Sequence, residues 1–192
     1  MCLKAAAITG PIRKNGKAAG PTGCEKRNRK PALSATIKVL LVERHEEARA
    51  AVAGYLASEP GLAVLRPCGN ATEAAASAKE HAPDVALISV MQPDTDGFAA
   101  AGAIQTACPD ARIIFVTTDA SDELIARALE MRAHGILGRE DSVSALPPAI
   151  REVMGGGTCF SEAIRARLII SPGGVLLAEP SQVSVAKTED KR

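Results

Sequence analysis

Aromatic residues and long apolar runs are both scarce in this chain. Only 2% of its 192 residues are aromatic, and there is no tryptophan. Platforms that stack nucleic-acid bases need exposed aromatic faces, so we do not expect nucleic-acid binding of that kind. No apolar run reaches the roughly 18 residues of a membrane-spanning helix, and the first residues lack a secretory signal. We therefore expect no membrane span.

Closely spaced cysteines are also missing. The chain has five cysteines, at positions 2, 24, 68, 108 and 159. None of them forms a CxxC pair, which excludes the common zinc and redox motifs built on that spacing. An odd number of widely spaced cysteines is typical of free thiols in a reducing compartment, which predicts a cytoplasmic protein.

Charge divides the chain into segments of different character. Residues 1–36 carry eight Lys or Arg against one Glu and are rich in Gly and Pro, which predicts a disordered basic arm. Residues 37–155 are expected to form the folded body. Residues 156–170 are expected to be a linker with a remnant of a short helix, and residues 171–192 a flexible tail. We expect a stand-alone module, because this tail is too short for a helix-turn-helix domain.

From Ile37 onward, apolar runs of strand length alternate with segments of helical period. Strands are expected over 37–42, 62–68, 84–90, 111–118 and 134–138, and helices over 46–61, 71–82, 98–108, 121–133 and from near Pro147 to near Met154. Asn70 is expected to cap the second helix, and Asp119 or Ser121 the fourth. Such alternation predicts an α/β fold with a flavodoxin-like doubly wound parallel sheet, order 2-1-3-4-5, and helices on both faces. A site is then expected beyond the carboxyl ends of strands 1 and 3.

The sequence gives little support to a phosphate-binding loop or to a hydrolase triad. The loop ERHEE after the first strand carries three carboxylates, which disfavours a phosphate-binding loop there. The GGG run at 155–157 follows a helix and is typical of a helix stop. Ser89 lacks the GxSxG elbow, so a hydrolase triad with His45 is disfavoured. We expect no enzymatic activity.

Four segments together carry a resemblance to a known family. IKVLLVERH, DVALISVMQPDTDG, IIFVTT and HGILGRE, within residues 37–154, resemble the receiver domain of response regulators in two-component signalling. The trailing GGGTCFSEAIRARL is similar to the linker found where receivers precede LuxR-like DNA-binding domains. The resemblance implies a phosphorylation pocket at the carboxyl ends of strands 1, 3, 4 and 5.

The family pocket is only partly present in this sequence. The resemblance implies two Mg²⁺-holding acids, an acceptor aspartate, a hydroxyl and a lysine, and these positions fall on Glu43, Arg44, Ser89, Thr117 and Arg139. The loss of two carboxylates and the gain of a cation disfavour Mg²⁺, which prefers carboxylate and water ligands. We expect no cofactor, no metal and no phosphorylation by the family route.

The resemblance also implies an aromatic residue that changes its rotamer when the domain is activated, and this residue is missing here. The position of that aromatic residue in the fifth strand falls on Ile136, an aliphatic residue that cannot reproduce the swing of an aromatic ring. The sequence therefore predicts a degenerate pseudo-receiver that binds a protein partner: a histidine kinase, a regulator or another signalling protein. A homodimer through the face of the fourth helix, fifth strand and fifth helix is one option. Arg44 or Arg139 is expected to bridge Glu43 and Thr117 and so to lock the pocket.

Two other functions remain open at this point. The first is a working phosphoacceptor that uses Asp94, Asp96 or Ser89. The second is nucleic-acid binding through the basic arm, whose segment KRNRK could contact phosphates. An upstream start codon assigned in error would remove that arm altogether.

Overall fold

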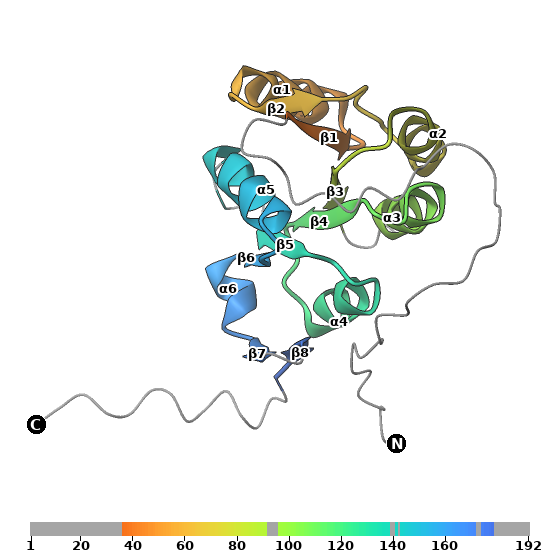
Figure 1. Ribbon diagram of the computed structural model, residues 1–192. Coiled ribbons are helices and arrows are strands. Elements are labelled where there is room, and N and C mark those ends of the chain that lie inside the picture. Colours follow the sequence, from red (N-terminus) through yellow and green to blue (C-terminus); the bar gives the residue numbers. More distant parts are fainter. Residues whose placement is uncertain (1–35, 92–95, 139–140, 142, 172–173, 179–192) are drawn as a thin grey trace, which may run out of the picture.

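Figure 1 presents a computed structural model of the chain. It describes residues 36–91, 96–138, 141, 143–171 and 174–178. The predictions for the basic arm, for Asp94 and for Arg139 lie outside the described residues, and so does the side chain of Asp96.

Strands and helices alternate along the described chain as the apolar pattern predicts. The strands of the main sheet are β1 (Ile37–Val42), β2 (Leu62–Val64), β3 (Val85–Val90), β4 (Arg112–Thr117), β5 (Gly135–Gly138) and β6 (Cys159–Phe160). The helices are α1 (Glu46–Ser58), α2 (Ala71–His81), α3 (Asp96–Ala107), α4 (Asp122–Glu130), α5 (Leu146–Met154) and α6 (Glu162–Arg165), with a 3-10 turn, η1 (Val143–Ala145), before α5. Within these ranges no helix is long and apolar enough to cross a membrane.

The main sheet is parallel and has the order β2-β1-β3-β4-β5-β6. The flavodoxin-like order predicted for the first five strands is confirmed, and β6 adds a sixth strand beside β5. The register pairs Val42 with Ile88 and Val90 with Thr117, and Thr117 in turn pairs with Gly138. This alignment brings the carboxyl ends of β1, β3, β4 and β5 to one edge of the sheet.

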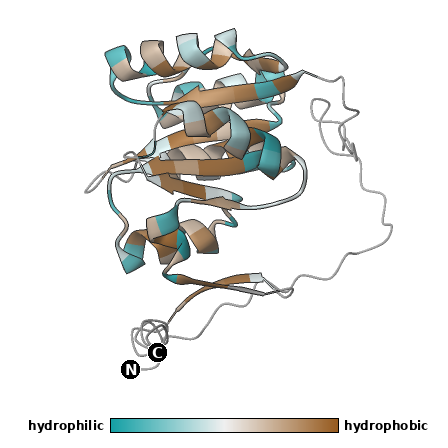
Figure 2. Cartoon of the chain, turned by 90° about the vertical axis from the view of Figure 1, so that its left-hand side faces the viewer, coloured by the Kyte–Doolittle hydropathy of each residue, from teal (hydrophilic) through white to brown (hydrophobic). Residues whose placement is uncertain are grey.

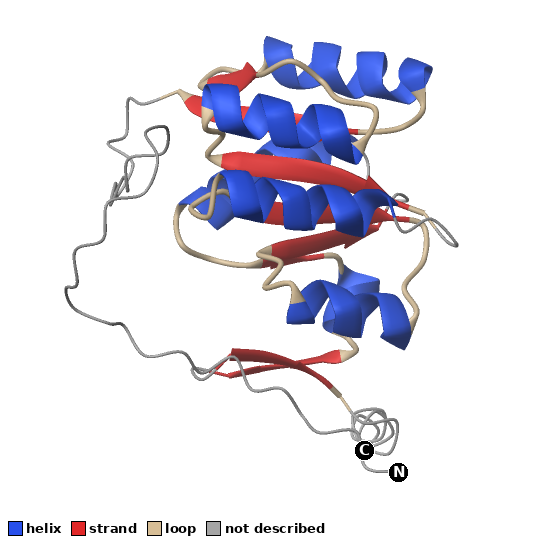
Figure 3. Ribbon diagram, turned by 90° about the vertical axis from the view of Figure 1, so that its right-hand side faces the viewer, coloured by secondary structure: helices blue, strands red, loops and turns tan. Residues whose placement is uncertain are grey.

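Side chains alternate between two apolar layers on the opposite faces of the sheet. Val39 and Leu41 of β1 pack with α1 and α5, whereas Leu40 and Val42 pack with the layer of α2, α3 and α4. Figure 3 shows α2, α3 and α4 crossing one face of the strands, and Figure 2 shows that the strands are the most hydrophobic part of the chain. Burial on both faces explains why the strands have continuous apolar sequences.

The helix ends follow local signals in the sequence. Asn70 caps α2, since its side chain accepts from the Glu73 amide at 2.9 Å, and Ser121 caps α4 by accepting from the Leu124 amide at 3.3 Å. Helix α5 begins at Leu146, which places the two following prolines in its first turn, where amide hydrogens have no helical partner. Gly155 ends this helix, in agreement with the predicted stop.

Strand β2 is shorter than predicted. It ends at Val64, and a single bridge between Val42 and Cys68 follows after a gap. Pro67 lies within the gap and has no amide hydrogen to give to a ladder. The prediction of one strand over 62–68 was therefore wrong in its second half.

The segment after residue 155 has more structure than the predicted linker and flexible tail. It contains β6, α6 and an antiparallel hairpin of β7 (Leu168–Ser171) and β8 (Gly174–Leu177). We call this segment, residues 157–178, the C-terminal extension. The prediction of a tail from residue 171 is wrong over 174–177, because apolar runs on both sides of the turn sequence SPGG pair as a hairpin. Phe160 and Ile164 of the extension are buried in the core layer that includes α4.

The C-terminal extension covers much of the surface predicted for a homodimer. Strand β6 pairs with β5, and the hairpin lies against α4 (Figure 1). Arg167 anchors the hairpin, since its guanidinium donates to the carbonyl of Ala120 and to the carboxylate of Asp122 at the start of α4. A dimer through α4 and β5 would need the extension to move first.

Candidate functional site

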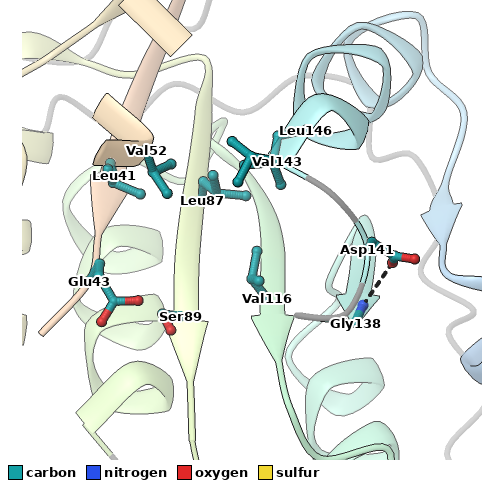
Figure 4. A pocket seen from close by; sticks show the side chains of 10 residues that line it. All are labelled: Leu41, Glu43, Val52, Leu87, Ser89, Val116, Gly138, Asp141, Val143 and Leu146. Atoms are coloured by element: carbon teal, nitrogen blue, oxygen red, sulfur yellow. Dashed lines mark hydrogen bonds between the residues drawn. The ribbon is translucent and has the colours of Figure 1, made fainter. Parts of the chain in front are cut away.

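Glu43 and Ser89 lie side by side where β1 and β3 end, and they line one pocket (Figure 4). Glu43 is only 4% exposed, although it carries a carboxylate, and Ser89 is half-buried. The pocket is lined by Leu41, Glu43, Val52, Leu87, Ser89, Val116, Gly138, Asp141, Val143 and Leu146. Of the four predicted pocket residues that the structure describes, Glu43 and Ser89 thus line the same pocket.

The loop that follows β1 is fixed by hydrogen bonds around Glu43. One oxygen of the Glu43 carboxylate accepts from the His45 amide at 2.9 Å. The Arg49 guanidinium reaches back from α1 and donates to the carbonyls of Glu43 at 2.8 Å and Arg44 at 3.2 Å. Arg49 was not anticipated, because nothing in its helical sequence context distinguishes it from a solvated arginine. The Arg44 residue itself is exposed.

Thr117 ends β4 and is 2% exposed, but its hydroxyl is engaged in a turn. The hydroxyl accepts from the Asp119 amide at 3.0 Å and lies 3.2 Å from the Asp119 carbonyl. The Asp119 carboxylate in turn accepts from the Ser121 amide at 2.9 Å and the Ser121 hydroxyl at 2.8 Å. The predicted phosphate-contacting hydroxyl therefore helps to shape the loop that leads into α4.

The end of β5 is closed by a residue that the sequence did not single out. The Asp141 carboxylate accepts from the Gly138 amide at 3.0 Å, and the Asp141 amide donates to the Gly138 carbonyl at 3.1 Å. Arg139 lies between these two residues, outside the described part of the chain, so the bridge from an arginine to Glu43 and Thr117 stays a prediction. The only available signal for Asp141 was an acid three residues after a strand-end glycine.

The switch position Ile136 is fully buried on the α4 side of the sheet. It pairs in register with Phe115 of β4 and with Phe160 of β6, and its carbonyl accepts from the Ser161 amide at 3.0 Å. Without the C-terminal extension β5 would be the edge strand, so β6 of the extension now contacts Ile136 on that side.

The donor set at the strand ends does not fit Mg²⁺. Among the family's pocket positions that the structure describes, Glu43 supplies a carboxylate and Ser89 a hydroxyl, and Arg44 follows as a cation. Asp141 lines the same pocket, but its carboxylate accepts from the Gly138 amide. Mg²⁺ binds through carboxylates, water and substrate phosphates. Across the described residues, no three His, Cys, Asp or Glu side chains gather as a metal site would require.

Residues 39–151 match the family model of the response regulator receiver domain. The chain belongs to this family. Its receiver domain includes the whole sheet except the first two residues of β1 and the strand β6. Family membership places the chain among the signalling modules of two-component systems.

Curated relatives and solved structures agree with this assignment. The response regulator protein VraR of Staphylococcus aureus is 27% identical over 133 residues, which cover 69% of this chain and 64% of the relative. A LuxR-family response regulator from Aurantimonas sp. SI85-9A1 is 25% identical, with a TM-score of 0.63 over 68% of this chain and 94% of that one. The isolated receiver of RcsB from Salmonella enterica serovar Typhimurium shares the fold, with a TM-score of 0.60 at 16% identity over 68% and 96% of the two chains. The match thus spans less than two thirds of the length of the curated relatives.

Proposed function

We propose that this chain is a receiver-type signalling module that acts by binding a protein partner and whose pocket is not phosphorylated by the family route. Ser89 carries the proposal, since it occupies the β3 position where the family resemblance requires the acceptor aspartate. An aspartate is an ionised nucleophile at neutral pH, whereas a serine hydroxyl must first lose its proton to a base. Arg44, in place of an acid, also removes a ligand for the metal that would neutralise the phosphoryl charge.

The class of partner follows from the family, and the surface for its binding is the one that the C-terminal extension leaves uncovered. Response regulators receive signals from other proteins, so a kinase, a second regulator or another signalling protein is the partner we propose. The extension occupies the sheet edge at β5 and part of α4. A partner therefore meets a surface in which these elements are already held in place.

Phosphomimetic titration tests the proposal directly. The similar RcsB receiver was solved in the presence of BeF3⁻, which makes this reagent suitable for comparison. With Mg²⁺ and BeF3⁻ we expect no saturable amide NMR shifts at Glu43, Ser89 or Thr117, and no phosphoryl mass gain with acetyl phosphate. Saturation at sub-millimolar Mg²⁺, or phosphoryl transfer to Ser89, Asp94 or Asp96, would establish a working phosphoacceptor and overturn the proposal.

A double variant supplies the positive control. In the double variant Arg44→Asp and Ser89→Asp, the two new carboxylates and Glu43 would fill the three acid positions of the family pocket. We expect this variant to gain saturable Mg²⁺ binding, because carboxylates are the ligands that Mg²⁺ prefers. It should not regain switching, since Ile136 remains aliphatic and buried.

A second candidate function, nucleic-acid binding, is favoured by one feature of the sequence. Residues 1–36 carry eight basic residues against one acid. A basic segment of this kind binds phosphates with an affinity that falls steeply as salt rises. DNA affinity that depends on salt and disappears when residues 1–36 are deleted would support this function. Equal DNA affinity of the full chain and of the chain without residues 1–36 would show that the arm does not bind the DNA.

A further inference from the structure

The hairpin of β7 and β8 is held to the receiver by one of its two faces. Side chains alternate along its strands, and Leu168, Val175 and Leu177 pack against the apolar layer that includes α4 (Figure 1). Ile169 and Leu176, which pair directly across the hairpin, are 43% and 39% exposed. A two-stranded hairpin is marginally stable by itself. The hairpin is therefore an element that can open while the main sheet stays folded.

One arginine connects the hairpin to the loop between β4 and α4. The backbone of Arg167 belongs to the hairpin, since its carbonyl accepts from the Ala178 amide at 2.8 Å. Its guanidinium donates to the carbonyl of Ala120 and to the carboxylate of Asp122. The side chains of Arg167 and Asp122 are 35% and 50% exposed, so the charge pair by itself adds little stability. The bond to the Ala120 carbonyl depends on the shape of the loop.

The shape of this loop depends on Thr117 at the end of β4. The Thr117 side chain is buried, and its hydroxyl accepts from the Asp119 amide at 3.0 Å and donates to the Asp119 carbonyl at 3.2 Å. The Asp119 carboxylate accepts from the Ser121 amide at 2.9 Å and from the Ser121 hydroxyl at 2.8 Å, which fixes Ala120 between them. A continuous series of hydrogen bonds thus leads from Thr117 to the carbonyl that Arg167 contacts.

We propose that the hairpin is a cover on α4 and that the turn at Thr117 is its latch, so that the docked hairpin and the closed turn stabilise each other. The coupling is reciprocal: a change that loosens the turn must favour the open hairpin, and an open hairpin must loosen the turn. The inference goes beyond the proposed function, because neither a phosphoryl group nor a partner takes part in it.

Hydrogen exchange of the full chain under native conditions tests the first direction of the coupling. Thr117→Val keeps the shape of the side chain but removes both hydrogen bonds of its hydroxyl. Exchange of the hairpin amides, including Ala178, should become faster by about fivefold, the effect of losing about one hydrogen bond. Thr118→Val, at an exposed neighbour, is the matched control and should leave the hairpin unchanged. Equal hairpin exchange in Thr117→Val and wild type would overturn the proposal.

Two further variants separate the latch from a loss of overall stability. Thr117→Ser loses a buried methyl group but keeps the hydroxyl, so its hairpin should exchange as slowly as that of wild type. Asp119→Ala breaks the same turn outside the sheet and should accelerate hairpin exchange as Thr117→Val does. This second variant keeps the proposal testable if Thr117→Val does not fold. Unchanged hairpin exchange in Asp119→Ala would overturn the latch.

The reverse direction is measured in the loop. Arg167→Ala should accelerate exchange of the Asp119 and Ser121 amides, and Arg165→Ala, at an exposed arginine, should not. In the double variant Thr117→Val and Arg167→Ala, the hairpin should exchange about as fast as in Arg167→Ala alone, because the connection is already broken. Independent effects would multiply instead, to about 25-fold for two fivefold changes, and would overturn the coupling. None of these results alters the phosphomimetic titration, which tests the proposed function alone.

Discussion

At the residue scale, Glu43 is the charged group whose burial most needs an explanation. It is 4% exposed and accepts from the His45 amide, and we expect a neighbouring arginine to complete its surroundings. Glu43→Gln keeps an oxygen acceptor for that amide but removes the charge. Hydrogen exchange should then become faster at the ends of β1 and β5, with the opposite ends of both strands unchanged. Unaltered protection together with unaltered partner binding would contradict a locked pocket.

A second residue, His134, makes stability depend on pH. Burial, and secondarily the nearby Arg112, hold the pKa of His134 below its ordinary value of 6.5. Its Nδ1 accepts from the Ile113 amide at 3.3 Å, which requires the neutral ring. Below pH 6.5 the unfolded chain binds a proton more readily than the folded chain, so the free energy of unfolding falls as pH decreases through this window.

Urea unfolding between pH 5 and 8 measures the effect of His134. Wild type should lose stability as pH falls below 6.5, and His134→Gln should flatten this part of the profile. His45→Gln replaces an exposed histidine and is the matched control. The pKa of Glu73 is lowered chiefly by the hydrogen bond from the Gly69 amide, so its contribution is lost only below 4.5, in a separate window. A profile that stays unchanged in His134→Gln would contradict the assignment.

At the scale of elements, the hairpin of β7 and β8 depends on its anchor to α4. Arg167→Ala removes the donors to Ala120 and Asp122, and should lower the free energy of unfolding by about 1 kcal/mol, since the pair is partly exposed. Amide exchange in the hairpin should rise more than in β1. Arg165→Ala, at an exposed arginine two residues earlier, should have little effect. Equal effects of the two substitutions would show that the anchor contributes nothing specific.

The elements also show what a sequence can and cannot predict. Strands buried on both faces, such as 37–42 and 85–90, stand out as continuous apolar runs, and the cap at Asn70 follows from its position before a helical period. Strand β6 has only two residues, and its pairing depends on long-range packing that no local pattern reports. At the site, the alignment of strand ends predicted the neighbours Glu43 and Ser89. The apolar pocket beneath them depends on how α1 and α5 pack on the sheet, which periodicity does not determine.

At the scale of the whole molecule, the C-terminal extension occupies part of the surface that a homodimer through α4 and β5 would use. In the described residues it pairs with β5 through Cys159 and Phe160 and packs its hairpin on α4. Leu168, Val175 and Leu177 of the hairpin contact the apolar layer that includes α4. An isolated two-stranded hairpin is marginally stable in water, so this packing is what holds it folded, and its removal would leave apolar surface exposed.

A chain that ends at Ala166 tests this arrangement. It keeps β6 and α6, with the buried Phe160 and Ile164, but lacks Arg167 and the hairpin. Sedimentation velocity should show association that increases with concentration for the shortened chain and less association for the full chain over the same range. Far-UV circular dichroism and a cooperative melt would confirm that the shortened chain is folded. If both chains associate equally, the hairpin does not cover the contact surface, and a dimer must form through another face, such as α1 and α5.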